Sequence, residues 1–524
     1  MSSVTATDNA HRTDINRPMI TISIMLATII QALDGTIANV ALPHMQGSLN
    51  ASQDQITWVL TSFIVAAAIA TPLTGWMSDR FGQKNVFLVS IAGFTLASVL
   101  CGLAGNLAEI VGARLLQGVF GAALVPLSQS TLLDINPREK HGSAMAVWGM
   151  GVMVGPILGP TLGGWLTDSY DWRWCFFINV PIGAAAFFGV CKFIPGVDAA
   201  RKIKFDTLGF ATLSLFIGAL QMVLDRGEQN DWFSSSETWI EAIIAALSFC
   251  VFVIHTATRP AGQSFFDYRL LLNRNFATGL LFIFIVGMVL FATRALQPTM
   301  LQGLMQYTPL VAGLVSAPSG LGTMIAMLFV GRLVGKVDLR LILGVGFILT
   351  AASLWWMCQY TLVLSQGDII WPGVIQGFGL GLVFVPLSAA SFATLSGNLR
   401  PDGTAIYSLI RNIGSSIGIA VVQVLLVSNT QAAHEGLVSN LNLNSPAVQN
   451  SLYGGNSPSA IAALNGEITR QASMIAYVDD FQLMFILTLL ALPLLLLIQV
   501  PKKPKPTPGE AQEQEEQVEL AAFE

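Results

Sequence analysis

An aspartate inside a long apolar stretch is the residue that points most directly to chemistry. Asp34 lies in IIQALDGTIANVALP, within a helix expected over 19–42. It is about 8 residues, or roughly 12 Å, from the C-terminal end of that helix. It is the only acidic residue well inside an expected membrane helix. A carboxylate at that depth must face a wet cavity or pair with a cation, and burial favours proton uptake. We interpret Asp34 as a proton carrier; the alternative is a polar residue that only hydrogen-bonds a neighbouring helix.

Two arginines also lie within expected membrane helices. Arg114, in GARLLQGVFG, lies at a depth close to that of Asp34, so a charged pair or a shared cavity is geometrically feasible. The alternative is that Arg114 extends its head group to the membrane surface. Arg411, in SLIRNIGSSIG, lies beside small residues that let helices approach closely, and its structural and functional interpretations remain equally open.

Polar residues in the expected helices predict a cavity for a small molecule. A mainly apolar cavity with a few polar groups suits many amphipathic compounds, so the pattern does not name one substrate. The candidate cavity residues are Gln31, Asn39, Gln117, Gln376 and Arg411.

A charged loop, GWMSDRFGQK, follows the second expected helix. It places Gly75, Asp79, Arg80, Gly82 and Lys84 at one membrane surface. Such a cluster is either a solvated signal of topology or a latch whose acid and base pair breaks when helices move apart.

The fifth expected helix, WGMGVMVGPILGPTLGGW, carries glycines at intervals of four residues. Glycines at this spacing let another helix backbone come near, while the prolines beside them bend the helix. We expect this stripe to act as a gate or hinge between two halves of the molecule. Its residues are Gly151, Gly155, Pro156, Gly159, Pro160 and Gly163.

The composition requires a membrane to position these residues. Hydrophobic residues make up 53% of the chain, charged residues only 11%, and the mean hydropathy is +0.63. A membrane helix needs about 20 mainly apolar residues. Fourteen stretches qualify: 19–42, 56–77, 86–105, 109–133, 143–166, 174–194, 207–225, 238–257, 276–297, 309–334, 341–364, 371–395, 404–428 and 482–500.

The distribution of Lys and Arg predicts the orientation, because cytoplasmic loops retain these residues. Of the 26 Lys and Arg residues, all but six fall on the same side of the membrane as the N-terminus. Arg114 and Arg411 lie within helices, and Arg173, Arg226, Arg294 and Arg470 fall on the other side. We therefore expect an even number of helices, with both termini in the cytoplasm.

An internal repeat predicts two halves of six helices. LQGVFGAALVPLS at 116–128 and IQGFGLGLVFVPLS at 375–388 are similar, as the fourth helix of each half requires. The expected regions are a cytoplasmic tail at 1–18, a first half at 19–194, two inserted helices with linkers at 195–275, a second half at 276–500 and a disordered tail at 501–524. Residues 429–481 are expected to form a long exported loop in the second half.

Taken together, the motifs resemble those of the fourteen-helix drug:proton antiporters of the major facilitator superfamily. The similar segments are LDGTIANVALP, GWMSDRFGQK, RLLQGVFGA and GVMVGPILGPTLGG. The resemblance implies proton coupling through Asp34 and Arg114, and a role between the halves for Gly155, Pro156, Gly159 and Pro160. Gln83 departs from the pattern, which has a basic residue there, so the latch has one charge fewer.

Within that family, LQMVLDRGEQNDWFSS and WCFFINVPIG look most like the EmrB branch. The resemblance implies an inner-membrane pump that works with a periplasmic membrane-fusion adaptor and a TolC-like outer-membrane channel. Its other partners would be small hydrophobic substrates, protons and membrane lipid, with no nucleic acid.

Other function classes have weaker support. A membrane enzyme would show a catalytic cluster, and a channel would show repeated polar pore residues; the sequence has neither. The five cysteines show no paired spacing, so we expect no metal or cofactor. Two alternatives remain: an importer of the same fold, and a transporter of one metabolite, lipid or siderophore that works without partners.

The topology can be tested by single-cysteine labelling with a membrane-impermeant maleimide in a cysteine-free background. In intact cells without their outer membrane, we expect Asn450→Cys to react and Lys336→Cys to react only after the inner membrane is opened. The reverse order of labelling would overturn the orientation.

Overall fold

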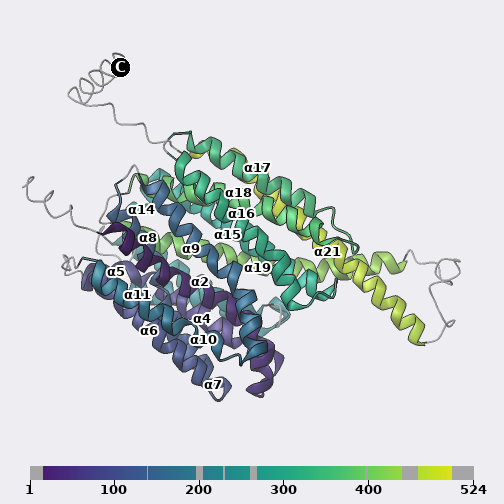
Figure 1. The fold of residues 1–524 in the computed structure, drawn as a ribbon. Coiled ribbons are helices and arrows are strands. Elements are labelled where there is room, and N and C mark those ends of the chain that lie inside the picture. Colours follow the sequence, from purple (N-terminus) through teal and green to yellow (C-terminus); the bar gives the residue numbers. More distant parts are fainter. Residues whose placement is uncertain are drawn as a thin grey trace, which may run out of the picture.

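The computed structural model describes residues 16–137, 140–195, 205–227, 230–259, 268–334, 336–395, 399–439 and 458–498. These residues form a bundle of helices (Figure 1). The first half contains α2 (Arg17–Ser48), α3 (Gln53–Ile56), α4 (Trp58–Ala70), α5 (Leu73–Phe81), α6 (Gln83–Leu103), α7 (Leu107–Gly121), α8 (Leu124–Ile135), α9 (His141–Ser169), α10 (Trp174–Phe177) and α11 (Asn179–Phe193).

The remaining helices complete the inserted region and the second half. The inserted region contains α12 (Thr207–Arg226), α13 (Ser236–Thr258) and the short α14 (Arg269–Leu272). The second half contains α15 (Arg274–Gly303), α16 (Pro309–Leu333), α17 (Leu339–Met357), α18 (Gln366–Ala393), α19 (Arg400–Ser439) and α21 (Pro458–Leu494).

The expectation of an all-helical membrane protein with about fourteen spans is confirmed. Within the described residues, thirteen helical segments are long and apolar enough to cross a membrane, and a bent pair makes up to fourteen. The bent pair is α4 and α5, which meet at an angle of 55°. Pro72 lies at the break, where its missing backbone N–H interrupts the helical hydrogen bonds.

The two ends of the bundle are named here by residues that lie there. The Arg17 end is where α2 begins and α21 finishes, and it also holds the turn between α5 and α6. The Gly105 end holds the turn between α6 and α7. Gly82 allows the tight turn at the Arg17 end because its φ of 83° is unfavourable for residues with a side chain.

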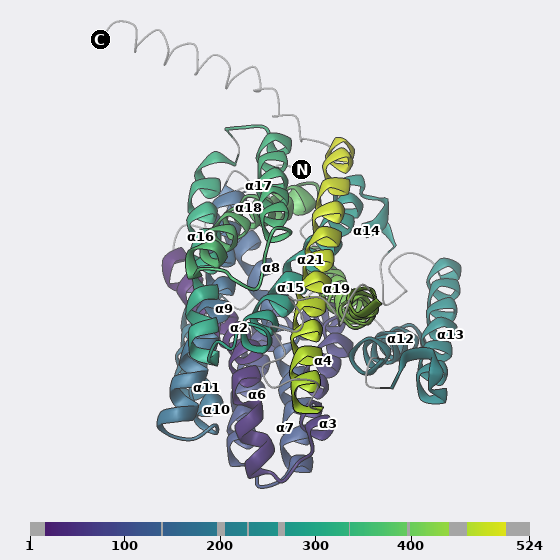
Figure 2. The ribbon, with the colours of Figure 1, turned by 90° about the vertical axis from the view of Figure 1, so that its right-hand side faces the viewer.

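The inserted helices α12 and α13 pack against each other at the side of the bundle (Figure 2). α12 contacts both α4 of the first half and α19 of the second half. Gln221 on α12 exchanges hydrogen bonds with Ser416 on α19, at 2.9 and 3.0 Å. The inserted pair therefore touches both halves along one flank.

The long loop expected at 429–481 is wrong over most of its length. α19 continues to Ser439 and α21 starts at Pro458, so both helices extend past the bundle (Figure 1). Residues 440–457 lie outside the described residues, as do the expected tails at 1–15 and 499–524. The low hydropathy of these helix extensions concealed them, because helices beyond a membrane need no apolar surface toward lipid.

Arg294 was counted on the exported side although it lies near the end of the helix expected over 276–297, and the structure places it inside a span. α15 continues for nine residues beyond it, to Gly303, and the side chain is half-buried. The extension of α21 likewise brings Asp480 into a span, with a fully buried side chain. Asp34 is therefore not the only acidic residue deep in a membrane helix.

The glycine stripe of α9 faces a different helix from the expected one. Methyl groups at Gly151, Gly155 and Gly159 would overlap Met25, Ala32 and Thr36, all on α2 of the same half. Gly163 packs against Ile37 and Val40 of α2 in the same way. Pro156 and Pro160 lie between these glycines in α9. The stripe therefore fixes α9 to the helix that carries Asp34, and not to the other half.

A different face of α9 contacts the second half. A methyl group at Gly149 would lie 2.7 Å from the sulfur of Met327 on α16, and one at Gly331 of α16 would lie 3.0 Å from Ala146. Trp148 stacks on Phe384 of α18 with ring centroids 5.8 Å apart. The contacts of α9 with the second half are thus made by these neighbours of the stripe.

The contact between α9 and α2 can be tested with Gly155→Ala. The added methyl group overlaps the carbonyl of Ala32, so we expect a loss of about 1–3 kcal/mol in the free energy of unfolding. The measurement is thermal unfolding of the purified protein in detergent, followed by tryptophan fluorescence.

The matched control is Gly164→Ala on the same helix. Its methyl group would meet only Val40, at 4.0 Å, so stability should stay near that of the wild type. Equal stability of the two variants would contradict the tight α2–α9 contact.

Candidate functional site

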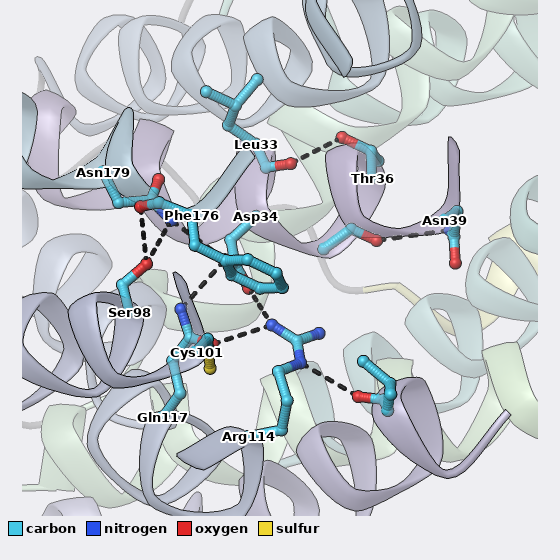
Figure 3. A network of polar contacts seen from close by, with 12 residues as sticks. Leu33, Asp34, Thr36, Asn39, Ser98, Cys101, Arg114, Gln117, Phe176 and Asn179 are labelled. Atoms are coloured by element: carbon cyan, nitrogen blue, oxygen red, sulfur yellow. Dashed lines mark hydrogen bonds and ion pairs between the residues drawn. The ribbon is translucent and has the colours of Figure 1, made fainter. Parts of the chain in front are cut away.

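Asp34 and Arg114 form a buried ion pair in the first half (Figure 3). Nη1 of Arg114 on α7 donates to Oδ2 of Asp34 on α2 at 2.6 Å. The side chains are 1% and 0% exposed, so neither charge reaches solvent in this conformation. The sequence-based expectation of a cation at the depth of Asp34 thus agrees with the geometry.

The guanidinium of Arg114 is held by further contacts. Nε donates to the backbone oxygen of Val59 on α4 at 3.0 Å, and Nη1 also donates to Oε1 of Gln117 at 2.8 Å. The ring of Phe63 lies beneath it, with the centroid 4.3 Å from Cζ. Such contacts lower the cost of burying a cation because they replace water around it.

The second carboxylate oxygen of Asp34 accepts two more hydrogen bonds. Nε2 of Gln117 donates to Oδ1 at 2.9 Å, and Nδ2 of Asn179 donates to the same oxygen at 3.0 Å. Nδ2 of Asn179 also donates to Oγ of Ser98 on α6 at 2.9 Å. Asp34 therefore joins α2, α6, α7 and α11 in one polar network.

Asn179 is a site residue that sequence reasoning missed. It begins α11, directly after the break at Ile178 that separates α10 from α11. The sequence feature that could have indicated it is a polar amide inside the apolar stretch WCFFINVPIG. That stretch was used only for the family resemblance. Asn179 is fully buried, and Asp34 and Ser98 accept the hydrogen bonds of its Nδ2, whereas its Oδ1 has no hydrogen-bond partner among the described residues.

The charge of Arg114 is matched at this site. The Asp34 carboxylate accepts three hydrogen bonds, one of them from the guanidinium, so the two side chains and their amide donors form one closed network. Protonation would remove an acceptor site facing Arg114 and weaken the contact between α2 and α7. The packing of α2 against α7 therefore depends on the contact between these two side chains.

Two of the candidate cavity residues lie elsewhere than expected. Gln117 is fully buried in the Asp34 network, and Gln376 is buried against α15, where it donates to Oγ1 of Thr293 at 3.3 Å. Both amides serve helix packing because buried polar groups require partners. Gln31 is half-buried and Asn39 is exposed. Arg411 is half-buried, and its Nε has no hydrogen-bond partner among the described residues.

The internal repeat is visible in these contacts. Gln117 and Gln376 are 259 positions apart, and so are Asp34 and Thr293. In each half, the glutamine of the fourth helix reaches the first helix at the matching position. Thr293 thus stands where the first half has its acid.

The charged loop lies at the Arg17 end, beside the second half. A methyl group at Gly75 would overlap Asp402 on α19, so α5 approaches this helix very closely. Lys84 donates to the backbone oxygen of Cys191 at 2.9 Å, and Gln83 donates to Thr131 at 2.9 Å. Asp79 is half-buried and Arg80 is exposed.

An ion pair between the halves lies near this loop and was not predicted. Nη1 of Arg400 on α19 donates to Oδ1 of Asp134 on α8 at 2.7 Å. Both residues flank expected spans, where charges serve equally well as topology signals, so the sequence alone does not pair them. This pair is a cross-half contact of the kind expected of the charged loop.

Comparison with known proteins identifies similar chains. The family model described as Major Facilitator Superfamily matches residues 24–419. The multidrug export protein EmrB of Escherichia coli K12 is 37% identical over 82% of this chain and 84% of its own. The fatty acid resistance protein FarB of Neisseria gonorrhoeae is 35% identical over 87% of this chain and 91% of its own.

The fold also resembles a solved structure. The crystal structure of the human organic anion transporter MFSD10 (TETRAN) matches with a TM-score of 0.59 at 15% identity. The match covers 90% of this chain and 99% of that one. At this identity the likeness supports the fold alone.

The cross-half ion pair can be tested by spin-label distances between Val89→Cys on α6 and Val345→Cys on α17. Removing the charge with Arg400→Gln should lengthen the distance at the Arg17 end. A partly exposed pair contributes about 1 kcal/mol, which changes the ratio of the two populations roughly fivefold.

The control is Arg226→Gln, which breaks the 2.6 Å pair with Glu237 inside the inserted region. It should leave the distance unchanged. The same lengthening in both variants, or none in Arg400→Gln, would rule out a latch at Asp134.

Proposed function

The chain belongs to the major facilitator superfamily, and we propose that it is a proton-coupled antiporter that exports hydrophobic or amphipathic drugs and toxic compounds across the inner membrane. The observation that carries this proposal is the buried pair of Asp34 and Arg114. Coupling to a proton gradient needs a group inside the membrane that is charged in one state and neutral in another. Export as the direction is supported by the names of the EmrB and FarB relatives.

In the proposed cycle, a proton arriving from outside neutralises Asp34 and loosens its bond to Arg114. The α2 helix can then shift relative to α7, and the cavity turns inward after drug release. Loss of the proton to the cytoplasm restores the ion pair and accompanies drug binding. Arg114 biases this cycle because its charge favours the ionised carboxylate.

The contacts between the halves support an outward-facing conformation. Asp134–Arg400 and Gly75–Asp402 join the halves at the Arg17 end. The close contacts of α9 with α16 run from that end as far as Ile157, which meets Gly320. With the Arg17 end in the cytoplasm, as the Lys and Arg distribution predicts, the cytoplasmic side of the cavity is closed.

The charges of the second half support one class of substrate. Arg294 and Arg411 lie in spans and form no ion pair with any described acid. Cations inside the membrane part of a transporter line a substrate pathway or form an ion pair in another conformation. An amphipathic compound with an acidic head group would complement them, in keeping with the name of the FarB relative.

A three-part export system is supported by the extensions of α19 and α21. α19 has 40 residues, or about 60 Å of helix, twice the hydrocarbon thickness of about 30 Å. Beyond the bundle, His434 and Asn465 contact each other at 3.0 Å and hold the two helices together. This projection at the Gly105 end would meet a periplasmic adaptor, which in turn would connect to a TolC-like channel.

The antiport proposal can be tested with Asp34→Asn in proteoliposomes. Asparagine keeps an oxygen that accepts from Arg114 and should leave the protein folded. It cannot take up or release a proton, so uphill export of a neutral drug and drug-induced proton release should both be lost. Drug accumulation and a pH-sensitive dye report the two quantities.

The control is Asp171→Asn, an exposed aspartate whose pair with Arg173 lies at the Gly105 end. It should export at the wild-type rate. Uphill export by Asp34→Asn at the wild-type rate would refute Asp34 as the proton carrier.

A further inference from the structure

A second buried carboxyl group lies in the last helix. Asp480 on α21 is 0% exposed, and neither of its oxygens has a hydrogen-bond partner among the described residues. By contrast, its neighbour Asp479 is exposed. The two adjacent aspartates therefore experience opposite environments.

The surroundings of Asp480 are apolar. The residues one turn away on the same face of α21 are Ala476, Tyr477 and Met484, which are all buried. Tyr477 and Met484 belong to a cluster whose members on other helices include Leu296 and Met300 of α15, Leu354 of α17 and Val422 of α19. No donor in this cluster reaches the carboxyl group, so nothing there compensates a negative charge.

The depth of Asp480 can be fixed from its neighbours. Nη1 of Arg470 donates to the backbone oxygen of Leu304, just past the last residue of α15, at 3.4 Å. Asp480 lies ten residues further along α21, about 15 Å deeper. Arg294 lies ten residues before Leu304 on α15, and therefore at about the same depth.

An ionised carboxylate without partners is far more costly in this place than the neutral acid. The two buried acids therefore differ: Asp34 is paired with Arg114, whereas Asp480 has no partner among the described residues. We propose that Asp480 is a second proton-binding site, protonated in this conformation and ionised when α15 and α21 rearrange so that it pairs with Arg294.

Charged and titratable groups near Asp480 lie on α21, in the connection after α17, on α15 and on α19. Tyr477 and Asp479 lie on α21, and Cys358 and Tyr360 lie in the connection after α17, where Tyr360 packs on Phe481. Arg294 lies on α15 and Arg411 on α19. Neither arginine forms an ion pair with Asp480 in this conformation.

The geometry of α15 explains why Arg294 does not neutralise Asp480. Arg294 lies two turns from Gly287, which packs on the backbone of Arg411, so both are on the face toward α19. Leu296 and Met300 face the cluster around Tyr477. A rotation of α15 would bring Arg294 to the carboxyl; the acid O–H bond then breaks, the proton passes to water and the carboxylate pairs with the guanidinium.

This site is distinct from Asp34 because it lies in the other half, and because its carboxyl group has no partner among the described residues whereas Asp34 accepts three hydrogen bonds. Its protonation follows from burial alone, whereas its contribution to export rests on the proposed function. A test of protonation without transport therefore separates the two proposals.

The test is infrared spectroscopy of the full-length protein in lipid nanodiscs. A protonated carboxyl gives a C=O stretching band that shifts in heavy water. We expect the wild type to show such a band in neutral buffer and Asp480→Asn to lack it. Asp479→Asn and Asp34→Asn should retain it. Asp480→Asn with a band of wild-type intensity would overturn the proposal.

Folding of the variants is checked by thermal unfolding. Asp480→Asn and Asp480→Leu should both fold, because a neutral side chain replaces a neutral acid in an apolar cluster. If Asp480→Leu fails to fold while Asp480→Asn retains the band, the carboxyl has only a structural hydrogen-bonding role and the proposal is wrong.

The role of Arg294 is tested by raising the pH. The wild-type band should decline in alkaline buffer as Asp480 ionises and pairs. In Arg294→Gln the ionised form loses its cation, so the band should persist to higher pH. An identical decline in both proteins would overturn the pairing with Arg294.

Discussion

The cost of an unpaired charge inside hydrocarbon is the constraint on which this structure depends. The cost is about 2.5–3.5 kcal/mol even on the insertion scales that give the lowest values. A buried acid must therefore pair with a cation, accept hydrogen bonds or bind a proton. Asp34 finds a cation and two amides, which come from two other helices, α7 and α11. The position of one carboxylate therefore fixes how α2, α7 and α11 pack, and any change in its charge must be answered by those helices.

The two halves meet this constraint differently although they share a repeat. In the first half the charges are paired and the network is closed. In the second half Thr293 replaces the acid, while Arg294, Arg411 and Asp480 stand without ion pairs among the described residues. A closed network holds one arrangement, whereas separate charges of opposite sign can form pairs in another arrangement. The second half thus has more to gain from a conformational change.

The sequence predicted the fold well, because long apolar runs and a repeated phrase follow directly from the bilayer and from duplication. It also predicted the depth of Asp34 and Arg114, since depth depends only on spacing along two helices. The helix that a given face contacts was harder to predict. The glycine stripe at Gly155 indicated that another helix lies close, but the sequence does not identify that helix as α2. Asp480 was missed because the polar sequence before it obscured where α21 begins.

The helix α9 connects the ion pair of Asp34 and Arg114 to the contacts between the halves. Its glycine stripe holds α2 so closely that backbone carbonyls of α2 lie where side chains would otherwise be. Its other face touches α16 through Gly149 and α18 through Trp148. A helix packed this tightly cannot absorb a shift of α2 by bending its own side chains, because the stripe has none. A movement of Asp34 on α2 must therefore displace α9, and with it the surface on which the second half rests.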